Sequence, residues 1–227
     1  MWNGYRKALT FSYDDGVVQD ARLVKVLNEY GLKGTFNLNS GIMTPESRWE
    51  YRGAQAVRMA PDGLKELYRG HEIAVHGVTH ADLTGMTRDE MLLEIGGDRK
   101  ALEQLFGCSI KGMAYAYGTH NGAVESAARD CGICWARTTV STGSFGIGPD
   151  LLVYNPTCHH ADEAIFRLAE RFVSDDGDED MLFYIWGHSY EFDADGGSWG
   201  EFERLCKYLS GRSDIFYCTN SEALCAG

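Results

Sequence analysis

The stretch Ala8-Leu9-Thr10-Phe11-Ser12-Tyr13-Asp14-Asp15-Gly16 reads as a buried β-strand that stops at an acidic turn. Aliphatic, aromatic and hydroxyl side chains fill its first six positions, and such residues favour strands. Two adjacent carboxylates and a glycine then end it, which is a common turn composition. Because an isolated Asp-Asp-Gly turn is ordinary, its meaning depends on what the rest of the chain places beside it.

Strands and helices alternate at least six times after this first strand. A helix is predicted across Leu23, Leu27 and Tyr30, with Gly31 as its stop. Further strands are predicted at 34–38, 72–75, 112–117, 133–138, 181–186 and 215–218, and further helices at 61–68, 87–106, 123–129, 161–173 and 199–209. This alternation indicates an α/β protein with a parallel sheet and helices outside. An open doubly wound sheet and a closed barrel both satisfy it, and both bind ligands at the carboxyl ends of their strands.

Length and composition are those of a globular protein. The chain has 227 residues, which fits one large domain or two small ones, and it is 44% hydrophobic and 24% charged. Lys and Arg total 21 and Asp and Glu total 33, so the formal net charge is −12. An acidic protein repels nucleic acid and anionic lipid. We therefore expect neither nucleic acid nor a membrane as a partner.

Seven cysteines are scattered along the chain without the spacing of a disulfide framework or a zinc knuckle. A reducing compartment is the more natural setting for such a set. Residues 1–7 lack the apolar core of a signal peptide, and no apolar run approaches the ~20 residues that cross a bilayer. The expectation is a cytoplasmic protein whose oligomeric state is left open.

Polar residues with chemical potential follow the predicted strands at several places. In chain order they are Asp14, Asp15, His76, His80, Tyr117-Gly118 and His188. The carboxyl ends of parallel strands lie on the same face of a sheet or barrel. We therefore expect acids, imidazoles and a glycine turn from four strands to converge there.

These residue types in this pattern favour a metal centre. Adjacent carboxylates repel each other unless a cation or a proton separates their environments, so one of them can bind a metal ion while the other faces a water molecule. His76 and His80 have ligand-like spacing, and Gly77 permits a tight turn between them. Two imidazoles and one carboxylate suit zinc, or another late first-row divalent ion such as cobalt or nickel. His188 can then protonate a departing amine.

Each feature alone also has an ordinary structural reading. Either histidine of the H-x-x-x-H pair can cap a helix, and a lone histidine more often serves as a hydrogen-bonded structural residue. His159 and His160 are adjacent, and neighbouring side chains of an extended chain point to opposite sides, so one of them is a candidate for the pocket wall. Only the combination at successive strand ends favours catalysis.

The motif at 10–16 followed by His76-x-x-x-His80 resembles the polysaccharide deacetylase family, also called the NodB-homology family or carbohydrate esterase family 4. The likeness extends to 31–36, Tyr117-Gly118, Trp135 and 185–188, and so covers most of the chain. Asp-Asp-Gly with the two-histidine motif is specific, whereas the later motifs are degenerate. The resemblance implies a distorted (β/α) barrel with about seven parallel strands, in a single catalytic domain over residues 1–227.

The resemblance also implies roles for individual residues. Asp14 becomes the catalytic base and His188 the general acid. The metal ligands that it implies are Asp15, His76 and His80. The residues implied or expected to contact the substrate are Tyr117 through its backbone N–H, Gly118, Trp135, Trp186 and Tyr190, with Glu191 as a further candidate beside Tyr190.

Two features depart from the family pattern. Its third motif normally begins with Arg and contains Pro, whereas residues 114–118 read Ala-Tyr-Ala-Tyr-Gly. That Arg usually orients the base, and the acid that commonly tunes the catalytic histidine is missing as well. Arg137 stands nearby, and we hypothesise that it supplies the positive charge to Asp14 from a neighbouring strand.

The sequence thus predicts a metal-dependent hydrolase that removes N-acetyl groups from an amino sugar or oligosaccharide, with a metal-activated water attacking the amide carbonyl. One alternative is a hydrolase of a small-molecule amide or acetyl ester. Another is a non-catalytic carbohydrate-binding relative, which the missing Arg and acid suggest. The expected partner is an N-acetylated carbohydrate or another small acylated substrate. The aromatic residues that favour stacking on sugar rings are Trp49, Tyr51, Trp135, Trp186, Tyr190 and Trp199.

Overall fold

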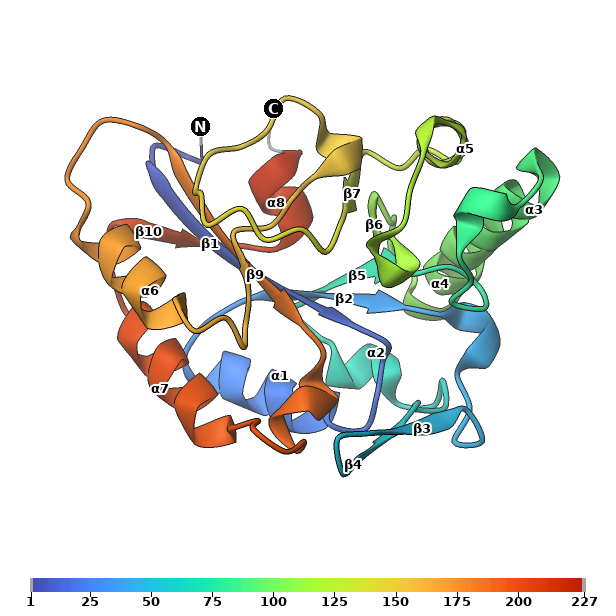
Figure 1. The fold of residues 1–227 in the computed structure, drawn as a ribbon, viewed down its shortest axis with the longest axis horizontal. Helices are drawn as coiled ribbons and strands as arrows, with labels where there is room; N and C mark the ends of the chain where they lie inside the picture. Colours follow the sequence, from blue (N-terminus) through green and yellow to red (C-terminus); the bar gives the residue numbers. More distant parts are fainter. Residues whose placement is uncertain (1, 226–227) are drawn as a thin grey trace.

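A computed structural model describes residues 2–225, and one parallel sheet dominates it (Figure 1). Seven strands lie side by side in the order β7-β6-β5-β2-β1-β9-β8, and β10 pairs separately with the first residues of β1. Curled into a half-barrel, they confirm the expected distorted (β/α) barrel. The strands of this sheet are β1 (Lys7–Asp14), β2 (Gly34–Leu38), β5 (Glu72–Val75), β6 (Gly112–Ala114), β7 (Trp135–Arg137), β8 (Cys158–His159), β9 (Met181–Gly187) and β10 (Ile215–Tyr217).

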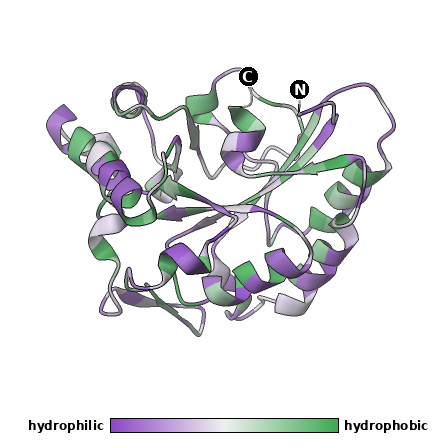
Figure 2. Ribbon diagram, turned by 180° about the vertical axis from the view of Figure 1, so that it is seen from behind, coloured by the Kyte–Doolittle hydropathy of each residue, from purple (hydrophilic) through white to green (hydrophobic). Residues whose placement is uncertain are grey.

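Helices cover the outer side of the sheet, and one short helix, Asn220–Leu224, packs on its concave side. The helices are α1 (Asp20–Glu29), α2 (Leu64–Leu67), α3 (Arg88–Leu92), α4 (Asp98–Phe106), α5 (Gly122–Asp130), α6 (Ile165–Ser174), α7 (Trp199–Leu209) and α8 (Asn220–Leu224). The outer ones carry both hydrophilic and hydrophobic residues (Figure 2), as expected when only one face is buried. Among residues 2–225, no helix combines the length and apolarity needed to cross a bilayer.

Alternation along β1 separates two cores. Leu9, Phe11 and Tyr13 pack outward with the helices, whereas Ala8 belongs to a second cluster on the concave side, with Trp135 of β7. Side chains two residues apart in a strand share a face. The concave face of β1 therefore continues through two hydroxyl residues and ends at Asp14, at the carboxyl edge of the sheet.

Several expected elements are shorter or shifted at their ends, and two of them break or end within the expected range. The helix expected at 87–106 begins at a capping box between Thr87 and Glu90, but a π-helical turn (Leu93–Gly97) separates α3 from α4. Gly96 lies there against Cys131, and an added Cβ would come 3.1 Å from its sulfur. The strand expected to reach Tyr117 ends at Ala114, because the backbone turns into a short 3-10 helix (Ala116–Gly118).

The segment around Trp49 and Tyr51, where the sequence predicted neither a strand nor a helix, forms an antiparallel hairpin. Its strands are β3 (Arg48–Tyr51) and β4 (Ala54–Val57). The hairpin lies between β2 and β5 in sequence, below the sheet in Figure 1, and it pairs with no strand of the main sheet. It reaches the carboxyl edge through Arg58, which forms an antiparallel bridge with Val17 just after β1.

Close packing of Trp135 on Gly112 gives a test of the fold. A Cβ on Gly112 would lie 1.8 Å from the Trp135 ring, so Gly112→Ala should lower the free energy of unfolding by about 2 kcal/mol. Gly122→Ala is the matched control, because a Cβ there meets no atom within 4 Å. Urea unfolding followed by circular dichroism measures both. Equal stability of the two variants would contradict the packing of β6 against β7.

Candidate active site

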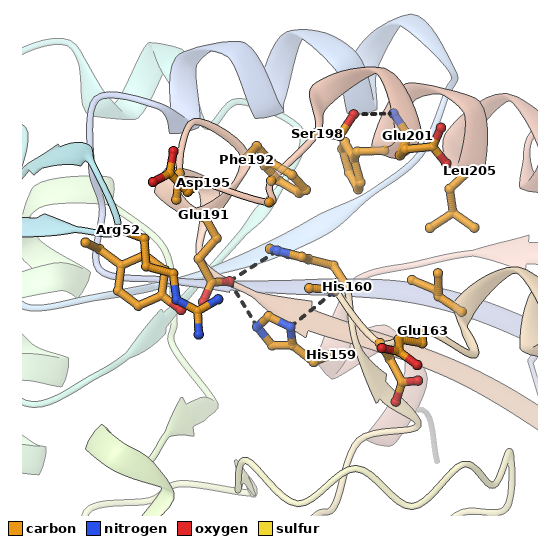
Figure 3. A pocket seen from close by; sticks show the side chains of 18 of the residues that line it. Arg52, His159, His160, Glu163, Glu191, Phe192, Asp195, Ser198, Glu201 and Leu205 are labelled. Atoms are coloured by element: carbon orange, nitrogen blue, oxygen red, sulfur yellow. Dashed lines mark hydrogen bonds and ion pairs between the residues drawn. The ribbon is translucent and has the colours of Figure 1, made fainter.

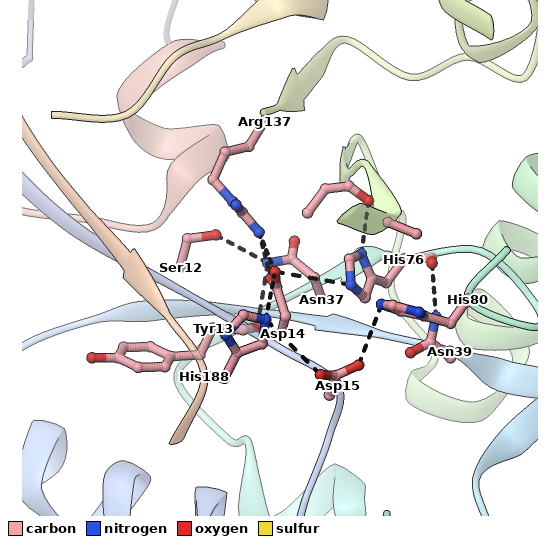
Figure 4. Close-up of polar contacts among 12 residues, drawn as sticks. Ser12, Tyr13, Asp14, Asp15, Asn37, Asn39, His76, His80, Arg137 and His188 are labelled. Atoms are coloured by element: carbon pink, nitrogen blue, oxygen red, sulfur yellow. Dashed lines mark hydrogen bonds and ion pairs between the residues drawn. The ribbon is translucent and has the colours of Figure 1, made fainter. Parts of the chain in front are cut away.

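A cavity of about 470 Å³ opens at the carboxyl edge of the sheet and collects most of the expected site residues. The residues that line it are Asp14, Asp15, Trp49, Arg58, His76, His80, Tyr115, Tyr117, Thr139, His188 and Tyr190. They come from different strand ends, as Figure 4 shows for the polar ones. The parallel sheet thus brings together the five residues predicted to carry the chemistry, which are up to 174 positions apart in the sequence. They are Asp14, Asp15, His76, His80 and His188.

Asp14 is held by two buried donors on the concave face. Arg137 Nη2 lies 2.5 Å from both carboxylate oxygens, and Asn37 Nδ2 donates to Oδ1 at 2.8 Å. Asn37 is the residue that pairs with Asp14 across β1 and β2. Arg137 in turn stacks on Trp186, with its guanidinium carbon 4.6 Å from the ring centroid. Arg137, from β7, therefore forms the ion pair with Asp14 that we hypothesised from the sequence.

This environment keeps Asp14 ionised. Burial by itself raises the pKa of a carboxyl group, but Arg137, then His76 and His188, lower the pKa of Asp14 to about 2. Both members of the ion pair are almost inaccessible to solvent, with side chains 3% and 0% exposed. Removing either partner would leave an uncompensated buried charge, which is costly.

Asp15, His76 and His80 offer ligand atoms that all lie within 4.8 Å of one another. His76 Nδ1 lies 2.8 Å from the carbonyl oxygen of Ala114, so this nitrogen carries the proton and Nε2 keeps its lone pair. His80 Nε2 lies 3.6 Å from Asp15 Oδ1. Burial lowers the pKa of both histidines to about 4, so both rings are neutral at pH 7. The chemistry of these donors fits a divalent metal ion.

The loop that carries His76 and His80 is fixed by neighbouring side chains. Asp98, the first residue of α4, accepts hydrogen bonds from the backbone N–H groups of His76 at 3.1 Å and Ser40 at 2.7 Å. Asn39 donates to the carbonyl oxygens of His76 and Gly77. Contacts within the protein therefore fix the position of His76, and this position does not require a bound metal ion.

Three cavity residues have left-handed backbones, which non-glycine residues seldom adopt. They are Asp15 with φ +82°, His80 with φ +59° and Tyr117 with φ +59°. Such strain persists only where surrounding contacts impose it, and it concentrates at functional sites. The three strained residues face one cavity, which supports its assignment as the site of function.

His188 links the cavity to a second polar cluster. Its Nε2 lies 3.8 Å from Asp14 Oδ2 and 4.0 Å from Asp15 Oδ2. Its Nδ1 lies 3.3 Å from Glu191 Oε1, a close contact that is poorly directed for a hydrogen bond. Burial alone would lower the pKa of His188, but Glu191 and the two aspartates raise it to about 9. His188 is therefore protonated at neutral pH.

Glu191 is the centre of a hydrogen-bond network (Figure 3). His159 Nε2 and His160 Nε2 lie 3.0 Å and 3.1 Å from its Oε2. Burial opposes ionisation, but contacts with the three histidines hold the pKa of Glu191 well below its usual range. Both adjacent histidines face this one carboxylate, which the alternation of an extended strand does not predict. The difference arises because β8 ends at His159 and the chain turns there.

His159, His188 and Glu191 also have ligand atoms within 4.8 Å of one another, yet they do not form a second metal centre. The backbone N–H of Ala161 donates to His159 Nδ1 at 3.1 Å, so the ring proton is on Nε2. A metal ion would need the lone pair of that nitrogen. The cluster is therefore a proton-bearing network that holds Glu191 beneath His188.

The expected substrate contacts are only partly in the cavity. Tyr190 and Tyr117 line it, and Tyr117 is 65% exposed. Gly118 lies behind Tyr117 against Thr139, whose Oγ1 would be 2.3 Å from an added Cβ. Trp186 is 8% exposed and lies beneath Arg137, outside the lining of the cavity.

The prediction that Trp135 lines a substrate groove is wrong. Its side chain is fully buried, and its Nε1 donates to Ser221 Oγ at 2.8 Å. Trp135 shares the concave face of β7 with Arg137 but lies two residues, or about 7 Å, deeper. Trp199, expected as a stacking residue, is buried as well and donates to Asp193.

Two residues that hold the adjacent aspartates carried no functional assignment in the sequence. Arg58 contacts Asp15 at 2.5 Å from beyond β4, and Asn37 holds Asp14 from β2. Glu191 was expected at the substrate and instead lies beneath His188. Asn37 could have been found from its place at the end of a strand beside Asp14. Arg58 gives no such signal, because its loop folds back only through the hairpin.

The Asp14–Arg137 pair makes a pH-dependent contribution to stability. The folded pKa of Asp14, about 2, lies below its ordinary 3.8, so this stabilisation is present above pH 3.8 and is lost as the pH falls through 2. Arg137→Met should lower the free energy of unfolding by about 3 kcal/mol at pH 7. At pH 3 the difference should narrow, since the unpaired carboxyl group of the variant takes up a proton.

Urea unfolding in EDTA at both pH values measures this effect. Arg69→Met is the matched control, because Arg69 is a solvent-exposed arginine whose side chain is 76% accessible. A loss from Arg137→Met that is equal at pH 7 and pH 3 would show that packing, and not charge, holds Arg137 in place.

Comparison with known proteins gives the family. The model of the family described as polysaccharide deacetylase matches residues 3–135, which is more than half of the chain and includes Asp14, Asp15, His76 and His80. A search of curated proteins gave no match.

Solved structures share the fold at low identity. A putative polysaccharide deacetylase from Mycobacterium smegmatis has a TM-score of 0.65 and 17% identity, over 98% of this chain and 91% of that one. A family 4 carbohydrate esterase from Streptomyces lividans in complex with acetate has a TM-score of 0.59 and 15% identity, over 97% of this chain and 96% of that one. The Streptococcus pyogenes deacetylase PplD in complex with acetate has a TM-score of 0.56 and 22% identity. The match covers 63% of this chain and 61% of PplD. The match of the family model over residues 3–135 shows that this chain belongs to the polysaccharide deacetylase family.

Proposed function

We propose that this protein is a zinc-dependent deacetylase that hydrolyses the N-acetyl group of an amino sugar or a short oligosaccharide. The observation that carries the proposal is the placement of Asp15, His76 and His80 in one cavity, with Asp14 and His188 beside them. Two similar structures are described as complexes with acetate, the product that this reaction would release. A cytoplasmic setting is part of the proposal, supported by free cysteines throughout the described residues.

Asp15, His76 and His80 would hold the metal ion, which when bound polarises a carbonyl group and makes water a better nucleophile at neutral pH. Asp14 stays ionised because Arg137 and Asn37 hold it, so it can accept a proton from the attacking water. Asp14 must remain free of the metal ion to accept this proton. Arg137 already contacts both of its carboxylate oxygens and Asn37 one of them, which favours Asp15 as the ligand.

His188 supplies the proton that the leaving nitrogen needs. Its Nε2 faces the cavity and its ring is protonated at neutral pH, while Glu191 lies at its other nitrogen. A base that is ionised and an acid that is protonated at the same pH, 3.8 Å apart, form the pair that amide hydrolysis requires. The backbone N–H of Tyr117 is proposed to receive the oxyanion.

The geometry favours catalysis over a non-catalytic carbohydrate-binding role. That alternative arose because two residues are absent from their usual positions in the family pattern: the arginine that orients the base and the acid that tunes the catalytic histidine. Arg137 now contacts Asp14, and Glu191 contacts His188, so each catalytic residue has an oppositely charged partner. Trp49, Tyr117 and Tyr190 line the cavity and offer aromatic faces to a sugar ring.

Metal loading and turnover test the proposal together. The protein with one equivalent of zinc should release acetate from N-acetylated chito-oligosaccharides, and EDTA should abolish the release. Asp14→Asn should still bind zinc, because Asp15, His76 and His80 remain, but it should lose about 1,000-fold in kcat/KM because the proton acceptor is removed. Asp178→Asn, at an exposed carboxylate, is the matched control.

The outcome also separates the alternatives. Turnover of a small amide or an acetyl ester without turnover of the oligosaccharides would transfer the proposal to that substrate class. Sugar binding with zinc present and no acetate released from any substrate would contradict a catalytic role.

Glu191 gives a second kinetic prediction. Glu191→Gln keeps the shape and removes the charge beside His188 Nδ1, so kcat should fall about 10- to 100-fold while KM changes less than about threefold. The reaction needs protonated His188, and the charge of Glu191 raises its pKa. The alkaline limb of the kcat profile should therefore move to lower pH in the variant.

Glu163→Gln is the control for this substitution, because Glu163 is a carboxylate on the neighbouring pocket of Figure 3 that does not contact His188. An unchanged alkaline limb in Glu191→Gln would show that Glu191 does not act through the proton of His188.

A further inference from the structure

Arg58 is a buried cation that the proposed reaction leaves without a role. It follows β4, and its backbone N–H donates to the carbonyl oxygen of Ser47 at 3.0 Å. Its side chain is 7% exposed and lines the same cavity as the proposed metal ligands. The guanidinium carbon lies 4.7 Å from the centroid of the Trp49 ring, so the hairpin holds both the cation and the aromatic face that covers it.

The guanidinium is directed at a proposed metal ligand. Nη2 lies 2.5 Å from Asp15 Oδ1 and 3.2 Å from Asn39 Oδ1, and Nη1 lies 3.3 Å from Ser47 Oγ. Asp15 Oδ1 is also the oxygen that lies 3.6 Å from His80 Nε2. The oxygen that faces the histidine ligand is therefore the same oxygen that Arg58 occupies.

The fixed charges of the site balance before any metal ion enters. Asp14 pairs with Arg137 and Asp15 pairs with Arg58, and all four side chains are at most 7% exposed. A divalent ion at Asp15 would lie close to a guanidinium in a poorly screened environment. Like charges at such distances repel strongly, and Asp15 is the one carboxylate within ion-pair distance of Arg58 among the described residues.

We propose that Arg58 is a built-in counter-ion of Asp15 that shares Oδ1 with the metal ion and so lowers the affinity of the site for divalent cations. The inference rests on the proposed metal centre. Arg58 balances the Asp15 charge when the ion is absent, and the ion must share or displace it on binding. The consequence is a centre that folds without metal and exchanges its ion readily.

A purely organising role for Arg58 makes the opposite prediction. If the arginine mainly orients Asp15 toward the ion, its removal should weaken metal binding. If it mainly competes for Oδ1, its removal should tighten binding. The two roles therefore differ in the sign of the change in Kd, which is measured without any turnover.

The experiment compares zinc and cobalt affinities of metal-free wild type, Arg58→Met, Arg58→Gln and Arg58→Lys. Titration against a chromophoric chelator gives Kd, and the cobalt absorption spectrum reports coordination at the site. Met keeps an unbranched stem against Trp49 without the charge, and Lys keeps the charge. Arg69→Met, the exposed arginine used above, controls for loss of a positive charge elsewhere.

We expect Arg58→Met and Arg58→Gln to bind zinc at least about tenfold more tightly than wild type, and Arg58→Lys to remain within about threefold of it. Zinc should also raise the melting temperature of Arg58→Met more than that of wild type. Equal or weaker binding by Met and Gln would overturn the proposal. If neither folds without metal, a tenfold loss of affinity in Arg58→Lys would overturn it instead, because it would show that orientation by the guanidinium dominates.

Failure of the metal centre itself has a different signature. Wild type and every Arg58 variant would then bind neither zinc nor cobalt, and His80→Ala would change nothing. If His80→Ala abolishes binding while the Arg58 variants match wild type, the metal centre stands and the inference about Arg58 fails.

Discussion

Asp14 and Arg137 lie 123 residues apart in the sequence and meet at 2.5 Å on the buried concave face of the sheet. Neither charge could be buried there alone, since an unpaired ion in the protein interior is strongly unfavourable. The pair therefore requires β1 and β7 to be in register with the strands between them. Arg137 contacts both carboxylate oxygens of Asp14, whereas Arg58 contacts only one oxygen of Asp15, the proposed metal ligand.

The same principle organises the rest of the site. Asp15 is paired with Arg58 and His188 with Glu191, so three oppositely charged contacts surround one cavity. The network on Glu191 includes His159 and His160, whose Nε2 atoms lie 3.0 Å and 3.1 Å from its carboxylate at the end of β8. Chemistry in this site depends on side chains that stay charged in a buried environment. Asp14 and Asp15 are held by partners from other elements, and His188 by Glu191, three residues further along the chain.

Much of the fold followed from local pattern. Alternating strands and helices predicted a parallel sheet, and the motifs at strand ends predicted which edge would carry the site. The Asp14–Arg137 contact was hypothesised from the sequence, because the family arginine is absent and Arg137 lies on another predicted strand; the structure contains this contact. Two predictions failed for another reason. Trp135 was assigned to the substrate groove, although it lies two residues deeper than Arg137 on the same face of β7. The hairpin of β3 and β4 was not predicted at all.

The sequence by itself determined the residues available for chemistry and the edge of the sheet at which they gather, because strand periodicity and strand ends are local properties of the chain. Only the tertiary structure decided the partners of Asp15 and Glu191. Arg58 reaches Asp15 because a hairpin folds back over the sheet, and Glu191 meets His159 and His160 because β8 lies beside β9. Such contacts join segments whose relative placement depends on packing of the whole core, and no periodicity in the chain records that.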